Sequence, residues 1–356
     1  MRALALGLII GVVLMEILAV AGGEWHEHWP AVFLLLIILA TGVHELGHLI
    51  AGWAVGFRFL SIQVGPFLLE SEYGILRPRI SFDIMALGFA GMFPNDVRRL
   101  RTRSLVYIAG GPAANFLTVL SIALVSHLVQ TEPTSTIATA VGQLAAVSLV
   151  LAMISLAPVQ SNDGALIEML LCSPLVARRW ISTLALGTQY NRGIRAKQWK
   201  QTWIRAATYV PDNSHGEFYA NWLAYLSAND RKDVAKAAQH LERCLTLTPS
   251  LTTKLRDLAA VEAAVFSAWY RMELHLAEKW RGQLTKPGSL SRLLQIRLET
   301  ALHCARSDFG AALTTWQSGF DVIQRLPQMS TTSALVDSWK EWKSEIQERQ
   351  AALTMA

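Results

Sequence analysis

The chain has 356 residues, which is long enough for two or more domains, and 52% of them are hydrophobic, a high share for a soluble protein. Its net charge of +5 is modest, and no Lys- and Arg-rich tract is interleaved with aromatic residues, so nucleic acid is not an expected partner. The three cysteines, Cys172, Cys244 and Cys304, form no CxxC pair, which argues against a disulfide framework and fits a reducing compartment.

Four apolar stretches are long enough to span a hydrocarbon core of roughly 30 Å, which requires about 20 helical residues. They cover residues 3–22, 30–56, 104–129 and 136–158. The first ends near Ala19-Val20-Ala21, the small-x-small form of a signal cleavage site, and its long apolar run favours an uncleaved helix over a signal. We therefore expect a transmembrane domain over residues 1–195.

The distribution of positive charge predicts the orientation of these spans. Residues 57–103 contain seven arginines, whereas the short connections at 23–29 and 130–135 contain neither Lys nor Arg. Because Lys and Arg are enriched in cytoplasmic loops, we expect the arginine-rich loop and everything after the fourth span to be cytoplasmic. The predicted location is a bacterial-type cell membrane, crossed several times, with the C-terminal domain in the cytoplasm.

The arginine-rich loop carries two β-like runs, residues 57–67 and 75–82, which predict a β-hairpin at the membrane surface. Residues 86–92 are too short to span a membrane and predict a re-entrant or interfacial segment. Because irregular backbone is not tolerated in lipid, this segment should be packed inside protein or line a cavity. After the fourth span we expect an interfacial helix at about 164–190.

From residue 196 to the end, the pattern is soluble and helical. Prolines recur after amphipathic helical stretches at spacings of 38, 38 and 40 residues, at Pro211, Pro249, Pro287 and Pro327. This period is typical of a helical solenoid and resembles tetratricopeptide repeats, with a plain helical bundle as the alternative. The predicted fold class is mainly α: a polytopic membrane domain with about four spans and a small β-hairpin, followed by a cytoplasmic helical repeat domain at 196–356.

The strongest chemical signal is His44-Glu45-Leu46-Gly47-His48, inside the second span. Residues four apart share one face of a helix, so His44 and His48 can present imidazole nitrogens to one metal ion. Zinc lowers the pKa of a water molecule towards 7, and a neighbouring carboxylate such as Glu45 can accept its proton. The alternative is a polar packing patch without metal, but such groups are costly in a span and indicate a function.

A catalytic zinc needs a third protein ligand, and the candidate is Asp163. Pro158 breaks the fourth span near its cytoplasmic end, and Gly164 lets the backbone turn so that the carboxylate points inwards. His44 is 14 residues from Pro30, about 21 Å along a helix, which places it nearer the cytoplasmic face and at about the depth of Asp163. A loop carboxylate at the membrane exit is the alternative.

The third element is Gly110-Gly111-Pro112-Ala113-Ala114-Asn115, in the third span. Small residues permit close helix packing. The amide of Asn115 can either hold substrate backbone or position a neighbouring helix, and both roles stay open.

These elements, in this order on successive spans, resemble the site-2 protease family of intramembrane zinc metalloproteases. The family signature HExxH, GPxxN and NxxPxxxxDG is matched by residues 44–48, 111–115 and 155–164, so the resemblance covers about residues 30–170. It implies that His44, His48 and Asp163 bind one catalytic zinc and that Glu45 is the catalytic base. It also implies a membrane-protein substrate with a transmembrane helix, clamped in extended form by a cytoplasmic strand, a role that fits the expected hairpin.

One position departs from the family pattern. Ser155 stands where the third motif begins with Asn, and the resemblance implies that this position orients the substrate or its oxyanion. We therefore predict Ser155 and Asn115 as substrate contacts, with Ser155 offering a shorter hydroxyl.

Three functions follow from these patterns. The first is hydrolysis of peptide bonds in or near transmembrane segments, with the C-terminal repeats as a binding surface for a protein partner. The second is a catalytically weak or inactive zinc-binding adaptor, for which Ser155 is the support. The third is a protease of the prenyl-protein processing type, which also carries HExxH but uses Glu as its third ligand.

Overall fold

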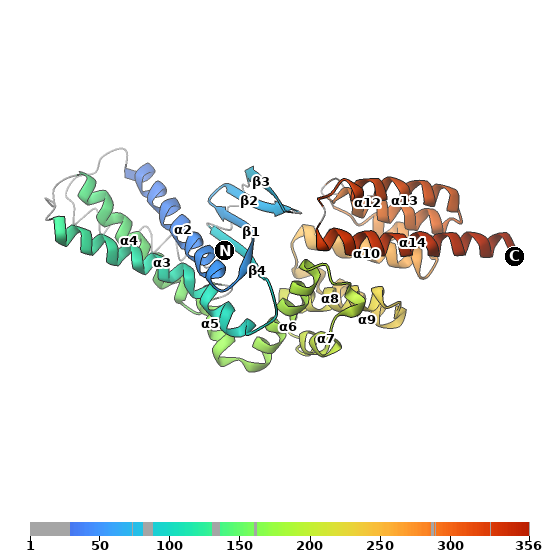
Figure 1. Ribbon diagram of the computed structural model, residues 1–356, viewed down its shortest axis with the longest axis horizontal. Coiled ribbons are helices and arrows are strands. Elements are labelled where there is room, and N and C mark those ends of the chain that lie inside the picture. Colours follow the sequence, from blue (N-terminus) through green and yellow to red (C-terminus); the bar gives the residue numbers. More distant parts are fainter. Residues whose placement is uncertain are drawn as a thin grey trace. The chain divides into compact units, whose positions relative to one another are not determined.

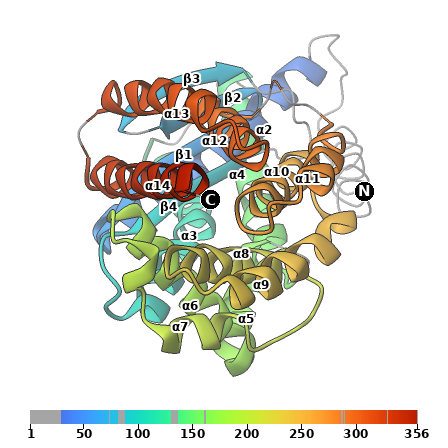
Figure 2. The same cartoon turned by 90° about the vertical axis from the view of Figure 1, so that its right-hand side faces the viewer.

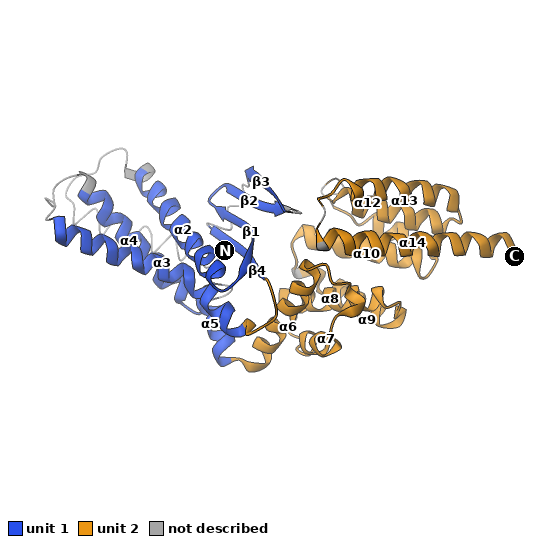
Figure 3. Ribbon diagram, in the orientation of Figure 1, with its two compact units in different colours: residues 1–94, 101–172 blue, residues 95–100, 173–356 orange. Residues whose placement is uncertain are grey.

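The computed structural model describes residues 29–72, 74–80, 88–129, 136–159, 162–285, 288, 290–327 and 329–355. The chain divides into two compact units, Met1–Pro94 with Arg101–Cys172 and Asn95–Leu100 with Ser173–Ala356 (Figures 1 and 3). We call them the N-terminal and the C-terminal unit. The expected span at residues 3–22 lies outside the described residues.

Three long apolar helices dominate the described part of the N-terminal unit: α2 (Trp29–Ala54), α3 (Leu100–Val129) and α4 (Thr136–Leu156). Each contains a stretch long and apolar enough to cross a membrane. Large apolar side chains on them, such as Leu35, Leu117 and Leu124, are exposed, as expected for surfaces that face lipid. Helices long and apolar enough to span a membrane are therefore present at three of the expected places, which indicates a membrane protein.

The segment after α2 forms one antiparallel sheet in the order β3-β2-β1-β4. Its strands are β1 (Phe57–Val64), β2 (Phe67–Glu72), β3 (Ile75–Ile80) and β4 (Gly88–Pro94). The expected hairpin was incomplete: the turn at Gly65, which has a positive φ of 55°, joins β1 to a second strand, β2. The expected re-entrant segment was wrong for residues 88–92, because they pair with β1 as an edge strand.

The sheet lies beside α2, with β1 running back along the helix that precedes it. A Cβ added to Gly42 would lie 3.7 Å from Val64, and one added to Gly88 would lie 2.5 Å from Thr41. Thr41 and Gly42 are near the middle of the apolar stretch Val32–Ala54. The sheet therefore packs against the middle of the helix, and its expected position at the membrane surface stays a prediction.

The helix expected at about 164–190 is two helices, α5 (Asp163–Cys172) and α6 (Pro174–Asn191), with a bend of 112° between them. Pro174 causes the break, since proline lacks a backbone N–H and is favoured at the first position of a helix. If the bent pair counts as one broken span, the described residues hold four candidate spans, and otherwise three.

The C-terminal unit is helical throughout its described residues. It contains α6, two short 3-10 turns, η1 (Ala196–Gln198) and η2 (Thr248–Ser250), and α7 (Gln201–Ala207), α8 (His215–Asp230), α9 (Val234–Leu247), α10 (Thr253–Trp269), α11 (Leu274–Arg281), α12 (Arg292–Ala305), α13 (Phe309–Gln324) and α14 (Ser330–Met355). Figure 2 shows α8 beside α9 and α12 beside α13, and α10 packs with α11. The helices α8, α10, α12 and α14 begin at residues 215, 253, 292 and 330, at intervals of 38, 39 and 38.

Each helix pair uses the same turn. A residue in the left-handed region, Lys232, Met272 or Ser307, comes directly before an acidic N-cap residue. The N-cap residues are Asp233, Glu273 and Asp308. In the first and third pairs the carboxylate accepts a hydrogen bond from the backbone N–H three residues later. The helix-pair period therefore exists in the fold, and the likeness to tetratricopeptide repeats remains a prediction.

The last helix, α14, lies across the turns of the preceding pairs. Glu341 binds Arg195 and Lys197, at 2.9 Å in each case. One helical turn later Glu345 pairs with Lys232, and after another turn Arg349 donates to the main-chain oxygen of Trp269 at 2.8 Å. Trp316 and Trp339 add an apolar contact between α13 and α14. The C-terminal unit is thus closed by its final helix.

Candidate metal centre

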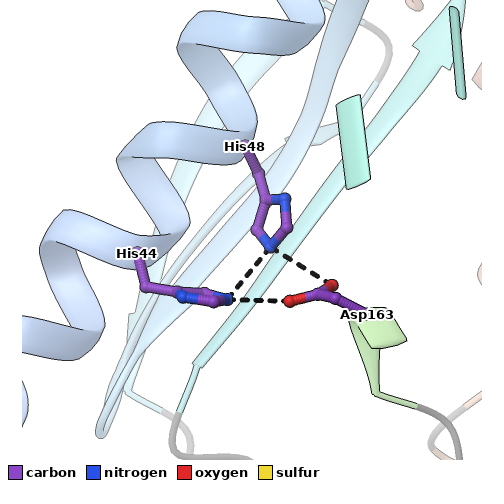
Figure 4. A group of neighbouring side chains, drawn as sticks. All are labelled: His44, His48 and Asp163. Carbon is purple, nitrogen blue, oxygen red and sulfur yellow. Dashed lines mark hydrogen bonds and ion pairs between the residues drawn. The ribbon is translucent and has the colours of Figure 1, made fainter. Parts of the chain in front are cut away.

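Three predicted ligands converge in the N-terminal unit (Figure 4). His44 and His48 lie one turn apart on α2, and Asp163 is the first residue of α5. The Nε2 atom of His44 lies 3.0 Å from Asp163 Oδ2 and 3.2 Å from His48 Nε2, and His48 Nε2 lies 3.4 Å from Asp163 Oδ1. Among the described residues, these three form a group that can hold a metal ion.

The spacing of the three donors fits a small tetrahedral ion. Ligand atoms roughly 2.0–2.1 Å from a tetrahedral zinc lie about 3.3–3.4 Å from one another. The three separations, 3.0 to 3.4 Å, are close to this value without any movement of the backbone.

Gly111 of α3 supplies the space beside the two imidazoles. A Cβ added there would lie 2.4 Å from His48 Nε2 and 2.6 Å from His44 Nε2. A Cβ atom does not approach a non-bonded nitrogen this closely, so no residue but glycine is compatible with these ring positions. The absent side chain leaves space that faces the Nε2 atoms of both candidate ligands.

His48 is held by Tyr107, a residue that the sequence motifs did not indicate. The Nδ1 atom of His48 lies 2.9 Å from the main-chain oxygen of Tyr107, and the two rings are 5.5 Å apart. A hydrogen bond from Nδ1–H to a carbonyl leaves the lone pair of Nε2 free for a metal. The Tyr107 hydroxyl also donates to the main-chain oxygen of Ala90 in β4.

His44 is held by Asn115, whose side chain is fully buried. The Nδ2 atom of Asn115 lies 3.3 Å from His44 Nδ1. The substrate role predicted for Asn115 stays a prediction, but its amide is in contact with a candidate ligand.

These contacts form one stripe along α3. Arg103, Tyr107, Gly111 and Asn115 are spaced four residues apart and share a face of the helix. Arg103 donates to the main-chain oxygens of Val55 and Gly56, at the end of α2. Along successive turns of α3, Arg103 binds the chain just after α2, and Tyr107 binds His48. Gly111 then leaves space for both imidazoles, and Asn115 contacts His44.

Asp163 is placed by the start of α5. Asn162 Oδ1 accepts a hydrogen bond from Ala165 N at 3.1 Å, which caps the helix, and Asn162 Nδ2 donates to Ile154 O of α4 at 2.9 Å. A Cβ added to Gly164 would lie 2.0 Å from Leu156 O. The expected reason for Gly164 is thus refined, because it permits a close approach of α5 to α4 rather than an unusual backbone angle.

Glu45 is buried on α2, with 6% of its surface exposed. No hydrogen bond to it is found among the described residues. A Cβ added to Gly88 would lie 2.4 Å from Glu45 Oε1, so the carboxylate lies against the first residue of β4. The sheet therefore reaches the residue expected to be the base.

Ser155 does not point to a substrate role in this conformation. Its hydroxyl donates to Ala152 O, one turn back in α4, at 3.0 Å. The predicted substrate contact remains untested.

No protein-family model, curated protein or solved structure matches this chain.

Proposed function

We propose that the protein is an intramembrane zinc metalloendopeptidase that hydrolyses peptide bonds in or near transmembrane segments of other membrane proteins. The observation that carries the proposal is the convergence of His44, His48 and Asp163 beside a buried Glu45 on an apolar helix. Ionisable residues in an apolar span are costly and mark function. Two imidazoles, a carboxylate and an adjacent free carboxylate are the set that metallopeptidases use.

The roles of the residues follow from their positions. His44, His48 and Asp163 would hold one zinc ion, which when bound supplies Lewis-acid polarisation and a nucleophile at neutral pH. Glu45 would accept a proton at its carboxylate from the attacking water and deliver it to the nitrogen of the departing amide. Tyr107 and Asn115 would keep the imidazoles oriented.

The substrate would bind in extended form along the outer edge of β4. A transmembrane helix must unwind before its carbonyls can be attacked, and an added strand satisfies the freed backbone groups. Of the two edge strands, β3 contains Pro78, which lacks an N–H, whereas β4 begins at Gly88 beside Glu45. The supporting strand is thus β4, and not the hairpin favoured by the sequence.

The test is Glu45→Gln in the full-length protein. Parent and variant should each bind about one zinc ion, and only the parent should cut. In membranes containing the Glu45→Gln protein, single-span proteins should accumulate uncut, as measured by quantitative mass spectrometry. The matched control is Glu168→Gln on α5, whose exposed side chain is not part of the metal group.

Two outcomes would redirect the proposal. Equal cleavage by parent and Glu45→Gln would show that Glu45 is not the base. A parent that binds zinc but cuts nothing, or that binds no zinc, would favour the membrane adaptor. The bond of the Ser155 hydroxyl within its own helix is the observation on the adaptor's side.

We also propose that the C-terminal unit is cytoplasmic and binds a protein partner. The support is the excess of arginine between residues 57 and 103, together with the series of helix pairs. A green fluorescent protein fused to the C-terminus should fluoresce in bacterial cells, and a dark fusion would place the unit outside. Deleting residues 200–356 should keep zinc binding and alter the substrates cut; an unchanged substrate profile would remove the partner role.

A further inference from the structure

The two candidate histidine ligands differ in what holds the ring nitrogen that does not face Asp163. For His48 both partners of Nδ1 are main-chain groups, the oxygen of Tyr107 at 2.9 Å and the N–H of Gly111 at 3.3 Å. For His44 the partner is a side chain, the amide of Asn115, at 3.3 Å. A main-chain carbonyl is present whatever residue occupies position 107, so only His44 depends on one particular side chain for this contact.

The amide of Asn115 is incompletely satisfied. Its Oδ1 is buried and has no hydrogen-bond partner among the described residues, while its Nδ2 faces His44 Nδ1. A buried amide oxygen without a donor is unfavourable and calls for an explanation. The neighbouring imidazole can supply the missing donor.

The position of the ring proton on His44 determines whether the amide oxygen of Asn115 has a donor and whether Nε2 can bind a metal. When Asn115 Nδ2 donates to His44 Nδ1, the ring proton resides on Nε2, where it can donate to Asp163 Oδ2 at 3.0 Å. An Nε2 that carries a proton has no lone pair for a metal. Binding through Nε2 requires the other tautomer, with the proton on Nδ1, and that proton needs an acceptor.

We infer that Asn115 is the positioning residue for His44: its amide oxygen accepts the Nδ1–H of His44 when Nε2 binds the metal. Half a rotation of the amide about its Cβ–Cγ bond exchanges oxygen and nitrogen in the same space, so the change needs no movement of either helix. This inference rests on the proposed metal site and adds to it a residue that selects the metal-binding tautomer.

The competing explanation is that Asn115 only fills space between α2 and α3. A leucine has nearly the same shape and keeps the packing, but it offers no acceptor. An aspartate also has this shape, keeps an acceptor and has no donor. The two substitutions therefore separate packing from hydrogen bonding.

The experiment measures zinc affinity of the full-length protein in detergent micelles, by competition with a chromogenic chelator, for the parent, Asn115→Leu and Asn115→Asp. We expect Asn115→Leu to bind zinc about 10- to 100-fold more weakly, as is typical when the partner of a metal-bound histidine is removed. We expect Asn115→Asp to stay within about 3-fold of the parent. The control is Ser104→Ala on α3. It removes a fully buried hydroxyl that has no hydrogen-bond partner in the part of the chain that the structure describes, and it should leave zinc affinity unchanged.

Zinc affinity of Asn115→Leu within about 3-fold of the parent would overturn the inference, and so would an equal loss in Asn115→Asp. If Asn115→Leu does not fold, ¹⁵N-histidine NMR of the zinc-loaded parent can test whether the Nδ1–H of His44 is held in a hydrogen bond. Both His44 and His48 should then show slowly exchanging Nδ1–H protons, and rapid exchange at His44 alone would contradict the role of Asn115. A parent without zinc would instead defeat the proposed function, so the two failures are distinguishable.

Discussion

At the scale of single residues, the candidate metal centre depends on the absence of a Cβ atom at Gly111. The two imidazoles of α2 point at the backbone of α3, and they can do so only because Gly111 has no side chain. Both Nε2 atoms would be displaced together by one methyl group. Displacements of this size at a metal site change affinity strongly, because the ligand geometry is set within a few tenths of an ångström.

The substitution Gly111→Ala should therefore weaken zinc binding by about 100-fold or more, since it affects two ligands at once. The control is Gly142→Ala in α4, where an added Cβ meets nothing within 4 Å. That change should leave zinc affinity intact and stabilise the helix by up to about 1 kcal/mol. Chelator competition on both purified variants checks the prediction, and similar affinities for the two would contradict it.

The sequence predicted the ligands and, of the residues that contact them, Asn115, but not Tyr107 or Asn162. His44 and His48 follow from helical spacing, and Asp163 from its place after a broken span. Tyr107 could not be found in this way, because it acts through a main-chain oxygen that every residue has. Asn162 did carry a signal in the sequence, because Asn is a preferred residue directly before the first turn of a helix.

At the scale of elements, the side-chain amide of Asn162 links the start of α5 to α4. Asn162 both caps α5 and binds Ile154 O, so it sets the direction of the residue that follows it, Asp163. A cap placed here orients a ligand as well as satisfying a helix end.

Replacing Asn162 by Ala should cost about 1 kcal/mol of stability and lower zinc affinity by about 10-fold. Asn162→Asp keeps the cap and loses the donor to Ile154, so its zinc affinity should fall between those of parent and Asn162→Ala. Ser214→Ala is the control, since it removes the N-cap of α8 in the other unit. It should lose similar stability in thermal unfolding without any change in zinc affinity; if it too weakens zinc, the effect is not local.

Among the strands, β2 was missed by the expected hairpin, and β4 was expected to be a re-entrant or interfacial segment. Residues 88–92 contain two glycines, an alanine and no β-branched residue, so neither strand propensity nor alternation is visible. Pairing with β1 and burial of Ala90 and Met92 decide the conformation. Such long-range pairing overrides local preference, whereas the spans were predictable because twenty apolar residues already determine a membrane helix.

At the scale of the whole molecule, the ion pairs of α14 connect the end of the chain to the start of the C-terminal unit. Arg195 and Lys197 lower the pKa of Glu341 to about 2, through charge-assisted hydrogen bonds that stabilise the carboxylate. Because the folded pKa lies below the ordinary value of 4.5, the stabilisation is complete above about pH 5. It is lost as the pH falls from about 4.5 towards 2.

Glu341→Gln should therefore lower the free energy of unfolding of the C-terminal unit at pH 7. The expected loss is only about 1 kcal/mol, because the side chain is 44% exposed and solvent screens its pairs. The difference between parent and variant should shrink between pH 5 and pH 3 in thermal unfolding followed by circular dichroism. Glu348→Gln, an exposed position on the same helix, should show no such difference; a loss that is independent of pH would mean that the ion pairs are not its source.

The closure by α14 limits how this part of the molecule can vary. Helix-pair arrays normally tolerate gain or loss of a pair, because each pair touches only its neighbours. Here Glu341, Glu345 and Arg349, each one helical turn after the last, bind Arg195, Lys232 and Trp269 in turn. The spacing of these three residues on α14 therefore matches the spacing of the helix pairs that they contact. If a helix pair were inserted among these contacts, α14 would lose at least one of them. The contacts made by this one helix thereby limit the number of helix pairs that the unit can contain.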